Sequence, residues 1–225
     1  KVVVPTEYAN FLHFLPSNDE VVTYEHQKAI SLQLLDEADL VFVLDFSALH
    51  RNEMGKKIAA SKAIKIMIDH HLDPDDFSHF QVWDTKASST AELIYEFMEL
   101  LNETSLINNK IATCLYTGIM TDTASFRFPL TTSTTHRVIA HLIDVGVEKS
   151  NIHNAVYDTN SFGRLKLMGC ALNNLRFLED FKTSYISLTN KELDAHDFQK
   201  GDTEGLVNYG LSIKGAKFAV IFIEH

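Results

Sequence analysis

The sequence predicts an α/β protein: a parallel sheet with covering helices, followed by a smaller, incomplete α/β domain. The apolar run 40–44 has the character of a strand buried on both faces, and 64–68 is a second run rich in β-forming residues. Segments with helical spacing of apolar residues alternate with these runs, which favours parallel strands joined by helices. After Lys182 the sequence pattern changes from helical to strand-like. A strand over 185–188 is followed by a polar, Asp-rich segment and then by a last apolar strand over 219–223.

The helices are predicted from apolar residues that recur every three or four positions. The residues Ser88, Ser89 and Thr90 can cap the helix over 90–101, and Gly146 can end the helix over 134–145. The predicted helices cover 56–62, 90–101, 108–120, 134–145 and 162–181.

The domain organisation follows from the change of pattern near the last of these helices. We expect a first domain over 1–160, a connector helix over 161–182, and the start of a second domain over 183–225. The chain begins on a short strand without a Met and ends on an apolar strand. We therefore expect residues to be missing at both ends.

The charge balance limits the partners. Among 225 residues, 20 Lys and Arg stand against 30 Asp and Glu, which gives a net charge of -10. Binding long duplex DNA needs a face of cations that neutralise phosphates, so the sequence argues against that partner. A short single-stranded RNA or a nucleotide remains compatible, because a metal bound by carboxylates supplies positive charge locally.

The compartment is predicted from cysteines and hydropathy. Cys114 and Cys170 both stand in apolar stretches of sequence, so we expect no disulfide framework and a reducing environment. No apolar run reaches the ~20 residues that a membrane helix needs, and no signal peptide opens the chain. We expect a cytoplasmic protein without a membrane partner, and the sequence leaves a homodimer open.

Acidic and imidazole side chains follow both predicted strands. Asp45 comes directly after 40–44, and Asp69, His70 and His71 come directly after 64–68. Functional residues of open parallel sheets lie at the carboxyl ends of the strands, so these side chains are expected at one edge. Asp122, after the helix over 108–120, is a further candidate.

The residue types predict a metal centre. Carboxylate oxygens combined with imidazole nitrogens bind Mn²⁺, Zn²⁺ or Fe²⁺, and oxygen-rich sites favour Mn²⁺ and Mg²⁺. A single Asp after a strand is most often a turn or capping residue, and a single His is most often a surface or packed residue. Because several such residues occur together at strand and helix ends, a metal centre explains them better than unrelated capping and packing roles do.

Four motifs, in order, resemble those of the DHH phosphoesterase superfamily. The segment 68–71 (Ile-Asp-His-His) matches its signature, and 87–96 and 117–128 resemble the later conserved segments of its oligoribonuclease and phosphoadenosine-phosphatase branch. The segment 202–208 resembles the opening of the DHH-associated substrate-binding domain. The resemblance runs from about residue 21 to the end.

The resemblance implies roles for single residues. Asp45 would bridge two divalent cations, expected to be Mn²⁺ with Mg²⁺ as an alternative. His70 and Asp122 would be further metal ligands. Asp69 would orient the imidazoles, as carboxylates do for ligating histidines, and His71 would lie at the scissile phosphate.

Four further residues are expected near the substrate. Arg127 and Arg164 are candidates for phosphate contact, since a guanidinium binds two phosphate oxygens at once. An ordinary surface charge explains Arg164 equally well and Arg127 less well. Ser89 and Thr90 either shape the pocket or cap the following helix.

The chain departs from the family pattern in two places. It lacks the N-terminal His-x-x-x-Asp-x-Asp motif and the C-terminal Gly-Gly-Gly-His segment. Without the first motif one cation would lose most of its ligands, so the chain as written is expected to bind metal weakly and to be a poor catalyst. We expect the intact protein to carry both motifs.

The expected function is a metal-dependent hydrolase that cleaves phosphate esters of short oligoribonucleotides and 3′-phosphoadenosine 5′-phosphate. Two cations ~3.5–4 Å apart would activate a water for this reaction. The alternatives within the same chemistry are a cyclic-dinucleotide phosphodiesterase, a single-strand exonuclease and a manganese pyrophosphatase. An alternative of another class is a nucleotide-binding module without turnover.

Overall fold

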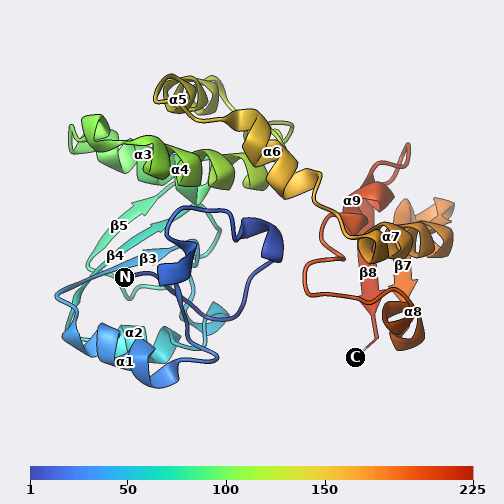
Figure 1. The fold of residues 1–225 in the computed structure, drawn as a ribbon, viewed down its shortest axis with the longest axis horizontal. Helices are drawn as coiled ribbons and strands as arrows, with labels where there is room; N and C mark the ends of the chain where they lie inside the picture. The colour runs from blue at the N-terminus through green and yellow to red at the C-terminus, as the bar shows by residue number, and fades with distance from the viewer. Residues whose placement is uncertain (225) are drawn as a thin grey trace. The chain divides into compact units, whose positions relative to one another are not determined.

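The computed structural model describes residues 1–224, which form two compact units (Figure 1). The first unit comprises Lys1–Glu7 and His13–His153, and the second comprises Tyr8–Leu12 and the residues from Asn154 onward. The fold is α/β with mainly parallel strands, as the sequence predicts.

The first unit is built on a parallel three-stranded sheet with the order β3-β4-β5. Its strands are β3 (Leu40–Leu44), β4 (Ile64–Asp69) and β5 (Phe80–Trp83). Leu44 pairs with Ile68, so β3 and β4 end side by side. A separate parallel pair consists of β1 (Val3–Val4) and β2 (Val22–Thr23).

Helices lie on both sides of the three-stranded sheet (Figure 1). On one side, Ile58 of α2 packs with Val43 of β3 in a shared apolar cluster. On the other side, Leu93 of α3 packs with Ile68 of β4. The helices that begin in this unit are α1 (Lys28–Glu37), α2 (Gly55–Ala60), α3 (Thr90–Leu100), α4 (Asn109–Asp122), α5 (Ser133–Asp144) and α6 (Lys149–Tyr157).

The expectation that 40–44 is buried on both faces is wrong. Val43 is 1 % exposed, but Leu40, Phe42 and Leu44 are 41–45 % exposed. These three residues alternate along β3 and so share one face. Because β3 is an edge strand, that face is only partly covered, chiefly where the Phe42 ring meets the ring of Phe97 from α3.

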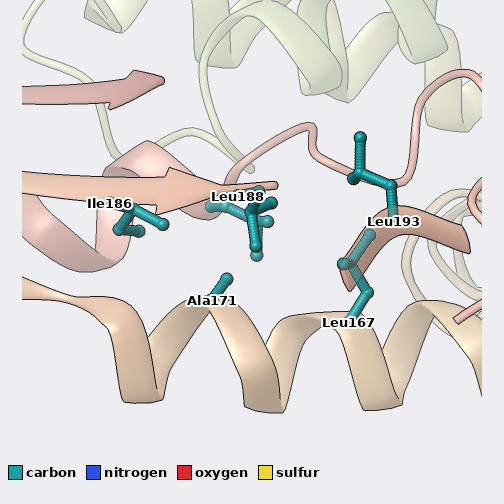
Figure 2. Packing of buried hydrophobic residues seen from close by; sticks show 6 residues of the cluster. Leu167, Ala171, Ile186, Leu188 and Leu193 are labelled. Atoms are coloured by element: carbon teal, nitrogen blue, oxygen red, sulfur yellow. The ribbon is translucent and has the colours of Figure 1, made fainter. Parts of the chain in front are cut away.

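The second unit combines three helices with a mixed sheet of the order β6-β7-β8. Leu167 and Ala171 of α7 face Ile186 and Leu188 of β7, and Leu193 of α8 completes this side of the core (Figure 2). The elements are α7 (Phe162–Asn174), β6 (Arg176–Leu178), β7 (Thr183–Leu188), α8 (Asn190–Ala195), α9 (Leu206–Leu211) and β8 (Phe218–Ile223). Strands β7 and β8 are parallel, whereas β6 and β7 are antiparallel.

The helix predicted over 162–181 is too long. It ends at Asn174, because Leu175 is extended with a ψ of 130°. The apolar residues that follow belong to β6, which pairs Arg176 with Tyr185 of β7. Lys182 turns the chain between the two strands in the left-handed conformation, with a φ of 49°.

Cysteine placement differs in part from the expectation. Both cysteines are free thiols, but Cys114 is exposed rather than packed in an apolar environment, and Cys170 is half-buried. Cys114 lies in α4, where helical geometry turns one residue in a mostly apolar segment toward solvent. Among residues 1–224 no helix combines the length and apolar character needed to cross a bilayer.

Candidate metal centre

The ends of β3 and β4 bring acidic and imidazole side chains together. Asp45 follows β3, Asp69 is the last residue of β4, and His70 and His71 come next. The backbone N–H of Asp45 donates to the Ile68 carbonyl at 3.1 Å, which keeps the two strand ends adjacent. The parallel register thus places all four side chains at one sheet edge, as the sequence predicts.

Asp122 reaches the same place from α4. Its Oδ2 lies 3.2 Å from Nε2 of His70, which lies 4.0 Å from Oδ1 of Asp45. Asp122 is the final residue of α4, whereas the predicted helix ended at residue 120 and left Asp122 beyond it. Its carboxylate therefore projects from the last helical turn toward His70.

Asp45 has an unusual backbone conformation. Its φ is 64°, in the left-handed region that an Asp tolerates more readily than most residues. Such conformations cost energy and cluster at functional sites. The side chain is also held, because Oγ1 of Thr90 donates to its Oδ1 at 2.8 Å.

The tautomers of the two imidazoles follow from their partners. Nδ1 of His70 lies 3.1 Å from the carbonyl of Ala87, and a carbonyl can only accept, so Nδ1 carries a proton. Nδ1 of His71 lies 2.7 Å from Oδ1 of Asp69, which also accepts the His71 backbone N–H at 2.7 Å. With Nδ1 bound to the Ala87 carbonyl, His70 directs Nε2 toward the carboxylates of Asp45 and Asp122.

Asp69 is fully buried, with 0 % of its surface exposed. Its Oδ2 has no hydrogen-bond partner among the 224 described residues. A buried carboxylate oxygen without a partner is costly. This observation is compatible with a site that gains polar or cationic partners when occupied.

Burial and neighbouring charges both act on the carboxyl of Asp122. Partial burial raises the pKa of the Asp122 carboxyl, His70 opposes this rise, and the Asp45 carboxylate adds to it. Like charges so close together favour a neutralised carboxyl. A bound cation would remove this repulsion.

The donor set fits a divalent metal. Asp45, His70 and His71 each offer a ligand atom, and these atoms lie within 4.8 Å of one another. Asp122 adds a carboxylate oxygen beside His70. Oxygen and imidazole nitrogen donors in this mixture suit Mn²⁺, Mg²⁺, Zn²⁺ and Fe²⁺.

The remaining predicted residues take different places. Ser89 is the N-cap of α3, and its hydroxyl accepts the Glu92 N–H at 3.1 Å. Thr90 is the first residue of α3, after the Ser89 cap, and its Oγ1 donates to Oδ1 of Asp45 at 2.8 Å, so the capping role falls to Ser89 alone. Arg127 is exposed, and its Nε donates to the Ala124 carbonyl at 3.0 Å.

Arg164 belongs to the second unit. Its Nη2 lies 3.4 Å from the Glu204 carbonyl, while its buried Nε lacks a hydrogen-bond partner within residues 1–224.

Two structural features of the site were not predicted from the sequence. The Ala87 carbonyl holds His70, but backbone oxygens leave no signature in a sequence. Residues 124–126, directly after α4, all have positive φ values of 48–65°, although none of them is a glycine. This left-handed turn sets the path of the chain between Asp122 and Arg127.

Comparison with known proteins identifies the family. Residues 3–119 match the model of the DHH family, N-terminal domain. A Bacillus subtilis protein named bifunctional oligoribonuclease and PAP phosphatase NrnA is 30 % identical over 95 % of this chain and 64 % of its own length. A cyclic-di-AMP phosphodiesterase, PdeA of Listeria monocytogenes, is 30 % identical over 53 % of this chain and 18 % of its own length.

A solved structure agrees with these relatives. An exopolyphosphatase-related protein from Bacteroides fragilis matches with a TM-score of 0.92 at 38 % identity, over 96 % of this chain and 64 % of that one. The chain thus spans less than two thirds of the Bacillus and Bacteroides proteins. Since the family model matches more than half of its residues, the chain belongs to the DHH family.

Proposed function

We propose that this protein is a metal-dependent phosphoesterase that hydrolyses short oligoribonucleotides, 3′-phosphoadenosine 5′-phosphate, or both. The observation that carries the proposal is the convergence of Asp45, His70 and Asp122, with His70 between the two carboxylates. Family membership supports phosphoester chemistry for this cluster.

Asp45, His70 and Asp122 would hold the cation, with Mn²⁺ as the preferred ion and Mg²⁺ as the alternative. His71 is a poorer ligand through Nδ1, because Asp69 already accepts from that nitrogen. A second cation would share Asp45 as a bridging carboxylate. Divalent cations supply Lewis acidity, which offsets charge on phosphate oxygens and lowers the pKa of water.

His71 is placed to handle a proton. Asp69 holds its ring through Nδ1, so Nε2 remains to accept a proton from water and, once protonated, to donate it to the leaving ester oxygen. The hydrogen bond from Nδ1 to the buried Asp69 carboxylate holds the ring, which makes Asp69 an orienting carboxylate.

The arginines would bind phosphate. The Nε of Arg127 is engaged by Ala124, which leaves its terminal nitrogens for phosphate oxygens. Arg164 would serve a similar purpose in the intact protein. Ser89 and Thr90 would shape the pocket wall beside Asp45.

Short, single-stranded substrates agree with the net charge of -10 and with the names of the relatives. We assign residues 183–225 to the start of a substrate-binding domain, preceded by a first domain over 1–160 and a connector over 161–182. The proposed setting is the cytoplasm. For the oligomeric state we propose a homodimer, because twofold dimers are the commonest symmetric assemblies of soluble proteins.

The test is a substrate panel on the complete product of the gene that encodes these residues. A dinucleotide, 3′-phosphoadenosine 5′-phosphate, a cyclic dinucleotide and pyrophosphate are each incubated with Mn²⁺ or Mg²⁺. We expect turnover of the first two, and a loss of at least ~100-fold in Asp122→Asn, on the scale that removal of a key electrostatic group costs.

Other outcomes would redirect the assignment. Preference for pyrophosphate, or full turnover in a folded Asp122→Asn variant, would contradict it. Preference for the cyclic dinucleotide would move the protein to that branch of the chemistry. Binding of nucleotide without turnover of any substrate would favour a binding module.

A further inference from the structure

A buried carboxylate, Glu92, lies in the first turn of α3 and outside the metal centre. It is 3 % exposed. Its Oε2 accepts the backbone N–H of Ser88 at 2.9 Å and also a hydrogen bond from the Ser88 hydroxyl. The hydroxyl of Thr135, from α5, donates to the same carboxylate at 3.1–3.2 Å.

The segment that Glu92 holds also contacts two candidate metal ligands. We call residues 87–90 the orienting segment. At its start, the Ala87 carbonyl accepts from Nδ1 of His70 at 3.1 Å. At its end, Oγ1 of Thr90 donates to Oδ1 of Asp45 at 2.8 Å.

Glu92 forms hydrogen bonds with the two middle residues of this segment. Ser88 is bound through both its N–H and its hydroxyl, and Ser89 accepts the backbone N–H of Glu92 itself at 3.1 Å. Two successive residues of the orienting segment are therefore tied to the same position of α3. A shift of Ser88 would move the neighbouring Ala87 carbonyl, because the two share a peptide unit.

Thr135 ties the same carboxylate to a second helix. Its hydroxyl accepts the backbone N–H of Thr132, the N-cap of α5, while it donates to Glu92. No Lys, Arg or His within residues 1–224 forms a salt bridge with Glu92. The carboxylate is thus satisfied by neutral donors, a rigid arrangement that fixes geometry.

We propose that Glu92 is a positioning residue of the metal centre, acting through the orienting segment. By holding Ser88 it sets the Ala87 carbonyl that selects the Nδ1–H tautomer of His70, and it sets the start of α3 from which Thr90 directs Asp45. The inference deepens the proposed function and depends on it for the identity of the ligands.

The test compares Glu92→Gln with Glu96→Gln, which makes the same change one turn further along α3. Glu96 is half-buried, and no hydrogen bond joins it to the orienting segment among the described residues. Ser88→Ala, which removes only one donor, is the second variant should Glu92→Gln fail to fold.

Two readouts are taken well below the melting temperature. Nitrogen NMR of the metal-free protein at about pH 8 reports which ring nitrogen of His70 carries a proton. Calorimetric titration with Mn²⁺ reports affinity. We expect Glu92→Gln to lose the dominance of the Nδ1–H tautomer and to weaken Mn²⁺ binding about tenfold or more, with Glu96→Gln unchanged.

A purely structural role would lower the melting temperature alone. A folded Glu92→Gln, or Ser88→Ala, with the parental His70 spectrum and Mn²⁺ affinity would overturn the proposal. If the parental protein binds no Mn²⁺, the proposed metal centre fails, and the His70 spectrum of the metal-free variants still decides whether Glu92 positions that ring.

Discussion

The carboxyl of Asp122 shows how a single residue of this site depends on its neighbours. Partial burial and the nearby Asp45 carboxylate raise its pKa, against the opposing effect of His70. The folded protein therefore retains this proton to a higher pH than the unfolded chain does. The free energy of unfolding falls as pH rises from about 3.8 through the raised pKa, and it stays lower above that.

Asp122→Asn should remove this loss in the metal-free protein. Urea unfolding in the presence of a chelator is expected to show that the variant gains stability relative to the parent between about pH 4 and pH 7. An equal difference between variant and parent at both pH values would contradict a raised pKa for the Asp122 carboxyl. Asp19→Asn, a change at an acidic residue outside the cluster, is the control.

Metal addition should reverse the order of the two proteins. At a Mn²⁺ concentration ~100 times Kd, the parent should gain about 2.7 kcal/mol at neutral pH. The Asn variant should gain far less, because it lacks one of the proposed ligands. Thermal melts with and without Mn²⁺ measure the difference, and equal gains would remove Asp122 from the ligand set.

At the scale of elements, helix ends determine where side chains and strands lie. Ser89, Asn108 and Thr132 each cap a helix of the first unit through a side-chain oxygen. In the second unit α8 has a capping box, in which Thr189 and Glu192 bond to each other's backbone N–H. Hydrogen bonds from Asn174 and Thr189 lower the pKa of Glu192 to about 2.

The low pKa makes the contribution of Glu192 dependent on pH. Its stabilising effect is complete above the usual value of 4.5 and is lost as pH falls toward about 2. Glu192→Gln should therefore lower the melting temperature at about pH 6 more than at about pH 3. Asp194→Asn in the same helix is the control, and a pH-independent effect of Glu192→Gln would contradict the prediction.

At the scale of the whole molecule, the chain divides into two units with separate apolar clusters. Leu167 of α7 is fully buried against Ile186 and Leu188, where a smaller side chain would leave a cavity. Leu167→Ala should destabilise the second unit by about 2–5 kcal/mol.

The matched control for that change lies on the same helix. Leu165 is 50 % exposed, so Leu165→Ala should change stability by only about 0.5 kcal/mol. Denaturant unfolding, followed by a probe in the second unit, measures both variants. Equal costs for the two changes would show that the packing of α7 differs from Figure 2.

The sequence by itself determined the α/β class, the strands over 40–44 and 64–68, and most helices of the first unit. These features depend on local periodicity, capping residues and the edge rule for parallel strands. The convergence of Asp45, His70 and Asp122 was predicted by combining that rule with the family motifs.

Only the tertiary structure decided three other features. The exposure of Phe42 depends on which strand lies at the sheet edge, and the end of α7 at Asn174 depends on pairing between β6 and β7. The third feature is a pair of hydrogen bonds. One joins Nδ1 of His70 to the backbone carbonyl of Ala87, and the other joins the backbone N–H of Ser88 to the buried Glu92 carboxylate. Apolar periodicity records which face of an element is buried, but the partner that buries it is set by contacts distant in sequence.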